Sequence, residues 1–144
     1  MKKLMDLVAR MSYILMRGTL EKEITGVTYD SRKVAPGCVF VCMVGAVTDG
    51  HQYLSQAIEQ GAVAVVVERD VEVPAGVTVL KVQNSRLALA ELAAAWFGHP
   101  ADELTTIGIT GTKGKTTTTY MIRQILEHAG LKTGLIGTIE AIIG

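Results

Sequence analysis

An uninterrupted apolar stretch, Val63-Ala64-Val65-Val66-Val67, most restricts the fold that this chain can adopt. Gly61 precedes the stretch and Glu68-Arg69-Asp70 follow it, so it is far too short to cross a bilayer. Its β-branched residues predict a strand, and the lack of polar alternation predicts that helices cover both faces of the sheet. The stretch therefore favours an α/β fold built on a parallel sheet.

The rest of the sequence repeats this alternation of short β-branched runs and helical patterns, which excludes all-helical and sandwich folds. Glycine or proline follows most of the helical patterns, as is typical where a helix ends. The predicted strands cover residues 24–29, 39–44, 62–68, 77–82, 104–110 and 133–138, and the predicted helices cover residues 3–16, 51–60, 86–97 and 117–129.

Composition and charge narrow the possible partners and the location. Fourteen basic side chains balance fourteen acidic ones, so the overall charge favours neither nucleic acid nor an anionic membrane as a partner. No apolar segment is long enough for a transmembrane helix, and Asp6 and Arg10 interrupt what would be the apolar core of a signal peptide. The sequence thus predicts a cytoplasmic protein.

The two cysteines, Cys38 and Cys42, lie four residues apart in a predicted strand. That spacing places them on one face of the strand but about 13 Å apart, which is too far for a disulfide. Further Cys or His residues at the short spacing of a metal site are missing from this region of the sequence. We therefore expect two buried, reduced thiols.

A domain boundary is predicted near residue 100, where Gly98-His99-Pro100 is followed by Asp102 and Glu103. The first domain would cover residues 1–100, with Trp96 and Phe97 packed in its core or at its interface. Residues 101–144 would form a single β-α-β unit. Such a unit leaves its sheet uncovered, so we expect it to need more chain than these residues supply.

A glycine-rich segment between a predicted strand and a predicted helix carries the clearest chemistry. Backbone N–H groups of such a loop, together with the helix N-terminus, can bind phosphates, as in a P-loop ATPase-type domain. Lys115 would contact the β- and γ-phosphates, and the Thr116 hydroxyl would bind Mg²⁺. The predicted nucleotide-binding residues are Gly111, Thr112, Lys113, Gly114, Lys115, Thr116 and Thr117.

The match to the phosphate-loop pattern departs at one position, because Ile109 stands where the full pattern has glycine. An ordinary strand-to-helix turn with a threonine-rich start is the alternative interpretation.

The segment Thr110-Gly111-Thr112-Lys113-Gly114-Lys115-Thr116-Thr117 resembles the nucleotide loop of the Mur ligase family, with Lys113 in place of that family's usual asparagine. Tyr29-Asp30-Ser31-Arg32 and Asp49-Gly50-His51 resemble the family's UDP-sugar-binding α/β domain. The resemblance implies an ATP-dependent amide ligase of peptidoglycan synthesis, with ATP and Mg²⁺ as cofactors, that acts through an acyl phosphate.

Two positions of the first domain are implied by this resemblance to contact the substrate. Ser31 would contact the UDP-sugar, and the loop formed by Ala46, Val47 and Thr48 would close over it. The residues alone favour a capped turn at Asp30-Ser31-Arg32, and it is the resemblance that favours substrate contact. His51 is interpreted as a residue at the start of a helix.

Within the family, the run of four threonines and Gly134-Leu135-Ile136-Gly137-Thr138 favour the members that add the third amino acid. The implied substrates are UDP-N-acetylmuramoyl-L-alanyl-D-glutamate and diaminopimelate or lysine. A dipeptide-adding ligase and a non-catalytic module that binds a nucleotide or UDP-sugar are the alternatives. Because the family's later motifs do not occur here, we expect the 144-residue chain alone to be inactive in ligation. The oligomeric state is left open.

Overall fold

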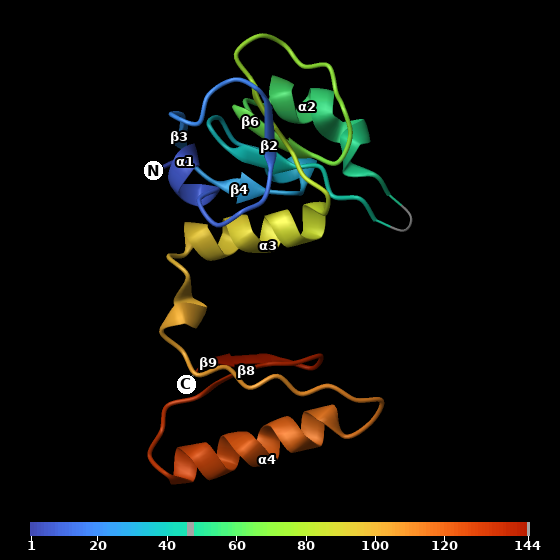
Figure 1. The fold of residues 1–144 in the computed structure, drawn as a ribbon. Coiled ribbons are helices and arrows are strands. Elements are labelled where there is room, and N and C mark those ends of the chain that lie inside the picture. The colour runs from blue at the N-terminus through green and yellow to red at the C-terminus, as the bar shows by residue number, and fades with distance from the viewer. Residues whose placement is uncertain (46–47, 144) are drawn as a thin grey trace. The chain divides into compact units, whose positions relative to one another are not determined.

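The computed structural model describes residues 1–45 and 48–143, and the chain divides into two compact units, Met1–Leu104 and Thr105–Gly144 (Figure 1). Each unit has its own strands and helices, and each is described separately below.

Among its described residues, the first unit contains seven strands and three α-helices, joined in part by 3-10 turns. Its strands are β1 (Lys2–Lys3), β2 (Ile14–Arg17), β3 (Glu23–Ile24), β4 (Val27–Thr28), β5 (Val39–Val41), β6 (Ala64–Val67) and β7 (Thr78–Lys81). Its helices are α1 (Leu4–Leu7), α2 (Leu54–Glu59) and α3 (Ser85–Trp96), and its 3-10 turns are η1 (Ser31–Lys33), η2 (Gly50–Tyr53) and η3 (Pro100–Asp102).

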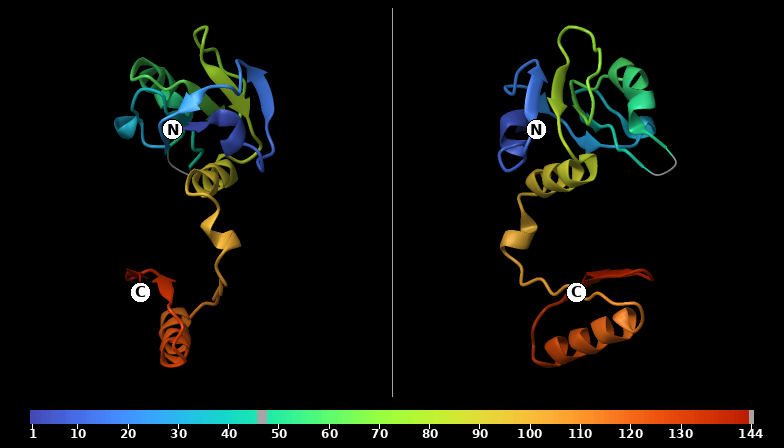
Figure 2. Two further views of the ribbon diagram at one scale, coloured as in Figure 1. Left: turned by 90° about the vertical axis from the view of Figure 1, so that its left-hand side faces the viewer. Right: turned by 45° about the vertical axis from the view of Figure 1, so that its right-hand side comes forward.

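A five-stranded sheet with the order β2-β7-β6-β5-β4 forms the centre of this unit. Strands β4 to β7 are parallel, whereas β2 joins the edge of the sheet antiparallel to β7. Side chains alternate between the two faces of the sheet, so Val39 and Val41 pack with α1 and α3 while Phe40 packs with α2. Figures 1 and 2 show α2 and α3 on opposite faces of the sheet, which confirms the predicted α/β fold.

Both cysteines lie in the apolar cluster on the α2 face and are unpaired, as predicted. Burial raises the pKa of the Cys42 thiol to about 12 and raises that of Cys38 as well. Both thiols are therefore protonated and unreactive at neutral pH.

The predicted helix over residues 3–16 is wrong in its second half. Helix α1 ends at Leu7, and Ile14–Arg17 instead form strand β2, which pairs with Thr78–Lys81. The pattern of apolar residues fits a helix, but the edge of the sheet offers these residues backbone hydrogen bonds to β7. Tertiary pairing thus overrides the local helical pattern.

The predicted strand over residues 24–29 is split at Thr25 and Gly26. The Thr25 N–H donates to the Gly37 carbonyl at 3.0 Å, and the Val39 N–H donates to the Gly26 carbonyl at 2.9 Å. The chain thereby changes partners, so β3 pairs with β1 in a small separate sheet while β4 pairs with β5.

The second unit consists of helix α4 (Lys115–His128) and the antiparallel strands β8 (Gly134–Ile136) and β9 (Ala141–Ile143). The predicted strand over residues 104–110 does not form among the described residues, because that extended segment has no pairing partner there. The predicted β-α-β unit is thus replaced by a helix and a hairpin. Strand β9 was not predicted.

Candidate functional site

The carboxyl ends of four parallel strands meet at one edge of the first unit's sheet. Ser31 follows β4, Asp49 and His51 follow β5, Glu68 and Arg69 follow β6, and Ser85 begins the helix after β7. Ligands of parallel α/β sheets bind outside the carboxyl ends of the strands. This edge is therefore the candidate binding site of the first unit.

Ser31 is the first residue of η1 and is only 9% exposed. The preceding Asp30 accepts a hydrogen bond from the Arg32 N–H at 3.0 Å and pairs with the Arg32 guanidinium at 2.9 Å. The side-chain hydrogen bonds from Arg32 lower the pKa of Asp30 to about 2. The capped turn predicted from these residues is therefore present, and it holds Ser31 at the carboxyl end of β4.

The loop after β5 carries the other predicted UDP-sugar residues. Ala46 and Val47 lie outside the described residues, and Thr48 is exposed. The Gly45 N–H donates to the Thr48 carbonyl at 2.9 Å, and the Gly50 N–H donates to the Met43 carbonyl at 2.8 Å. The structure therefore defines both ends of this loop, with Thr48 close to Gly45.

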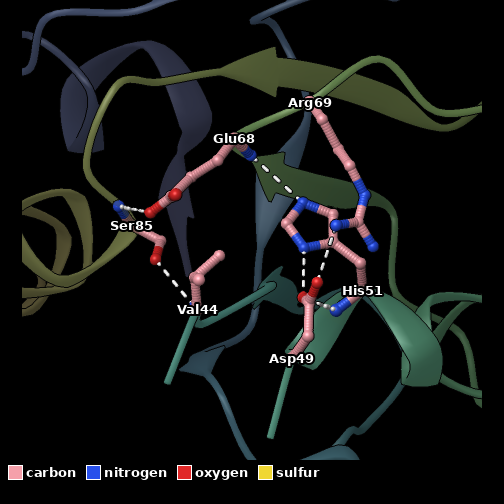
Figure 3. A network of polar contacts seen from close by, with 6 residues as sticks. All are labelled: Val44, Asp49, His51, Glu68, Arg69 and Ser85. Atoms are coloured by element: carbon pink, nitrogen blue, oxygen red, sulfur yellow. Dashed lines mark hydrogen bonds and ion pairs between the residues drawn. The ribbon is translucent and has the colours of Figure 1, made fainter. Parts of the chain in front are cut away.

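A polar network that the sequence did not predict connects this loop to β6 and α3 (Figure 3). Asp49 accepts hydrogen bonds from the His51 N–H at 2.9 Å, from His51 Nδ1 at 2.6 Å and from Arg69 Nη1 at 2.7 Å. Ser85 joins the other end of the loop, since its Oγ accepts from the Val44 N–H at 3.1 Å. The sequence contained one indication, the Asp-Gly-His spacing of a capped turn.

Acid should weaken the first unit through Asp49. The hydrogen bonds from His51, led by that from its backbone N–H, lower the pKa of Asp49 to about 2, from an ordinary value of about 3.9 in unfolded chains. A lowered pKa stabilises the fold above the unfolded value, and this contribution is lost as the pH falls from about 4 to about 2. Asp49→Asn should therefore show a smaller decrease in Tm over this window, measured by circular dichroism. The same decrease in Tm with pH for the unsubstituted chain and Asp49→Asn would contradict the role assigned to Asp49.

The predicted phosphate loop lies at the start of α4 in the second unit. Gly114 precedes the helix with φ 78°, a left-handed conformation that glycine adopts without strain, and α4 begins at Lys115. The Lys115 ammonium donates to the Gly111 carbonyl at 2.6 Å, so its charge lies across the loop. The Thr118 and Thr119 hydroxyls bond back to the carbonyls of the preceding turn.

This loop has the groups that a magnesium nucleotide requires. The first N–H groups of an α-helix have no acceptor within the helix and favour an anion. Thr116 is exposed in the first turn of α4 and supplies a hydroxyl, the oxygen ligand that Mg²⁺ accepts beside phosphates. A Cβ at Gly114 would meet no atom within 4 Å, so the space beside the loop is open. The residues of this loop therefore fit a magnesium nucleotide.

A hollow of about 300 Å³ lies beside the phosphate loop within the second unit. Lys115, Thr116 and Thr119 line one side, and the end of β8 and the following turn line the other. The Tyr120 hydroxyl donates a hydrogen bond to the Glu140 carboxylate, and this bond raises the pKa of Tyr120. The turn after β8 is thereby connected to α4 next to the loop.

Two family models match the chain in the same places as these two sites. The model described as "Mur ligase family, catalytic domain" matches residues 23–97, which is more than half of the chain. The chain belongs to the Mur ligase family. A second model, "Mur ligase middle domain", matches residues 109–144 and so includes the whole predicted phosphate loop.

Individual Mur ligases are similar over most of the chain. The UDP-N-acetylmuramoyl-L-alanyl-D-glutamate--2,6-diaminopimelate ligase of Syntrophomonas wolfei is 46% identical over 142 residues, which cover 99% of this chain and 29% of that protein. The chain thus spans about three tenths of that relative's length.

Solved structures agree with this relationship. A UDP-N-acetylmuramoylalanyl-D-glutamyl-2,6-diaminopimelate--D-alanyl-D-alanyl ligase from Acinetobacter baumannii has a TM-score of 0.64 at 30% identity, over 88% of this chain and 28% of that one. A MurF ligase from Thermotoga maritima in complex with ADP has a TM-score of 0.51 at 31% identity, over 71% of this chain and 23% of that one.

Two further observations on this member of the Mur ligase family concern metals and membranes. Among residues 1–45 and 48–143, no three His, Cys, Asp or Glu side chains gather as a metal site. None of the helices in these two ranges has the length and apolar character needed to cross a membrane.

Proposed function

We propose that this chain is the N-terminal part of an ATP-dependent ligase that adds the third amino acid, diaminopimelate or lysine, to UDP-N-acetylmuramoyl-L-alanyl-D-glutamate in the cytoplasm. The single observation that carries the proposal is the 46% identity, over almost the whole chain, to a ligase named for that reaction. Further relatives named for third-residue addition are 42–53% identical to the chain, which favours third-residue addition over dipeptide addition.

The second unit would bind ATP as the start of the ligase's central domain. ATP supplies the phosphoryl group that activates a substrate carboxylate, with Mg²⁺ neutralising charge. Backbone N–H groups over Gly111–Thr117 would hold the phosphates, and Thr116 would hold the metal. Lys115 already lies across the loop at Gly111, so its ammonium would place positive charge beside the transferred group. These residues would thus position the nucleotide and neutralise its charge.

The first unit would anchor the UDP-sugar at the carboxyl edge of its sheet, through Ser31 and through the loop of Ala46, Val47 and Thr48. Ser31 supports this role because the capped turn holds it at the carboxyl end of β4, where its hydroxyl could form a hydrogen bond with a substrate. Ligation would require the longer chain, so the 144 residues alone are not expected to turn over.

Calorimetric titration of the 144-residue chain with UDP-N-acetylmuramoyl-L-alanyl-D-glutamate tests the proposal. Saturable binding is expected, and Ser31→Ala should weaken the Kd about tenfold through loss of one hydrogen bond. Ser55→Ala, an exposed serine on α2, is the matched control and should leave the Kd unchanged.

A parallel titration with Mg-ATP distinguishes the proposed ligase fragment from a general phosphate-loop protein. Binding of Mg-ATP without binding of the UDP-sugar would contradict a UDP-sugar domain and favour a general phosphate-loop protein. Binding of the UDP-sugar that Ser31→Ala leaves unaltered would remove Ser31 from the site.

A further inference from the structure

The polar network around His51 joins three consecutive segments at the carboxyl edge of the sheet (Figure 3). Asp49 and His51 come from the loop after β5, Glu68 and Arg69 from the end of β6, and Ser85 from the start of α3. Thr48, which precedes this network directly in the chain, is one of the residues that we propose to contact the UDP-sugar. The network is therefore adjacent to the residues proposed to contact the UDP-sugar without including them.

His51 is the buried centre of the network, since its side chain is only 2% exposed. Its Nε2 lies 3.1 Å from the Glu68 backbone nitrogen, and its Nδ1 lies 2.6 Å from Asp49 Oδ1. A backbone N–H can only donate, so Nε2 must accept and the proton of the neutral ring is on Nδ1, facing Asp49. Both ring nitrogens are thus used, one within the loop and one across to β6.

These two bonds have different consequences for the loop. The bond to Asp49 is local, because Asp49 lies two residues before His51. The bond to the Glu68 N–H spans seventeen residues and fixes the end of the loop against the end of β6. Arg69 also reaches Asp49, but its side chain is 61% exposed, and such an ion pair contributes little. Because the His51 side chain is buried, the His51–Glu68 bond is the main side-chain connection at this end.

The backbone around His51 is closely packed, which limits how the loop can adjust. A Cβ on Gly50 would lie 2.6 Å from the Met43 nitrogen, so the two ends of the loop approach as closely as the backbone permits. At the first end, Ser85 Oγ accepts from the Val44 N–H, and the Ser85 N–H donates to Glu68 Oε1 at 2.7 Å. Both ends of the loop are thus linked to Glu68, one end directly through His51 and the Val44 end through Ser85.

We propose that His51 is a positioning residue for the UDP-sugar: its bond to the Glu68 N–H fixes the Thr48 end of the loop for substrate binding. This inference rests on the proposed function, because it requires that the UDP-sugar binds at this edge of the sheet. Preorganisation of a binding loop raises affinity by removing the cost of ordering it on binding.

Two substitutions that each preserve one of the two His51 bonds test the proposal. In His51→Gln the side-chain oxygen can still accept from the Glu68 N–H, whereas in His51→Asn the amide can replace only the contact to Asp49. Titration of the 144-residue chain with UDP-N-acetylmuramoyl-L-alanyl-D-glutamate should give a Kd weakened about tenfold for His51→Asn and less than about threefold for His51→Gln.

A matched control separates positioning from general stability. Thr78 is a buried polar residue at the other end of the sheet, and its hydroxyl bonds to the Thr19 backbone at 2.9 and 3.3 Å. Thr78→Val should lower the Tm as His51→Asn does, yet leave the Kd unchanged. Equal affinity in the unsubstituted chain and both His51 variants, or equal weakening in the two variants, would overturn the inference alone. Failure of the unsubstituted chain to bind would overturn the proposed function as well.

Discussion

Lys115→Ala should slow product formation by the full-length ligase about 10²- to 10³-fold, the usual effect of removing one preorganised group that stabilises developing charge. The loop offers one side-chain cation that already lies across it, because the Lys115 ammonium is 2.6 Å from the Gly111 carbonyl. Backbone N–H groups and a threonine hydroxyl remain after the substitution, so some nucleotide binding should survive. The decrease should therefore appear mainly in kcat, measured by phosphate release at saturating ATP.

Lys113→Asn is the matched control for this prediction, because it removes a lysine from the same loop and introduces the residue that the family usually has there. It should change kcat by less than about tenfold, since an exposed charge is screened by solvent. An increase in turnover would show that Lys113 hinders the reaction. A loss as large as that of Lys115→Ala, or an active Lys115→Ala enzyme, would contradict the role assigned to Lys115.

The parallel strands of the first unit were predictable because each one is encoded by its own residues. The run at residues 63–67 is apolar on both faces, and the structure places it in β6, between β5 and β7. Glycines after the helical patterns set their ends close to the observed ends of α2 and α3. Local composition is sufficient where a strand is buried on both sides.

The errors share one physical cause, which is that edge and unpaired segments depend on partners far away in the sequence. Residues 14–17 become a strand only because β7 offers hydrogen bonds, and residues 104–110 remain extended because no described strand pairs with them. Met121 and Ile125 lie four residues apart on α4, the spacing of one helix face, yet both side chains are exposed.

The candidate sites also differ in whether neighbouring residues or distant segments form them. The phosphate loop is a contiguous sequence motif, so the sequence predicted it with its residues, whereas the His51 network is assembled from segments after three strands. His51 was interpreted only as a residue at the start of a helix, and the structure does place it in η2 before α2. Its bond to Glu68 depends on the parallel pairing of β5 with β6, which no local pattern reveals.

Phe40→Ala should destabilise the first unit by about 3–5 kcal/mol, the cost of deleting a buried aromatic side chain and leaving a cavity. Phe40 is fully buried on β5, the strand between β4 and β6, where it packs in the cluster beneath α2. Small domains are stable by only about 5–15 kcal/mol, so this loss should shift urea unfolding to a much lower midpoint. Trp96 is the only tryptophan and lies in α3, so its fluorescence reports unfolding of this unit alone.

Phe97, the other phenylalanine, provides the control that decides what the Phe40 result means. The sequence predicted that Phe97 packs in the core or at its interface, but Phe97 follows the end of α3 and is 76% exposed in the structure. Phe97→Ala should therefore cost less than about 0.5 kcal/mol. Equal losses in the free energy of unfolding from the two substitutions would contradict the burial of Phe40 and the exposure of Phe97. A loss below about 1.5 kcal/mol for Phe40→Ala would mean that the α2 face lacks the close packing expected of a protein interior.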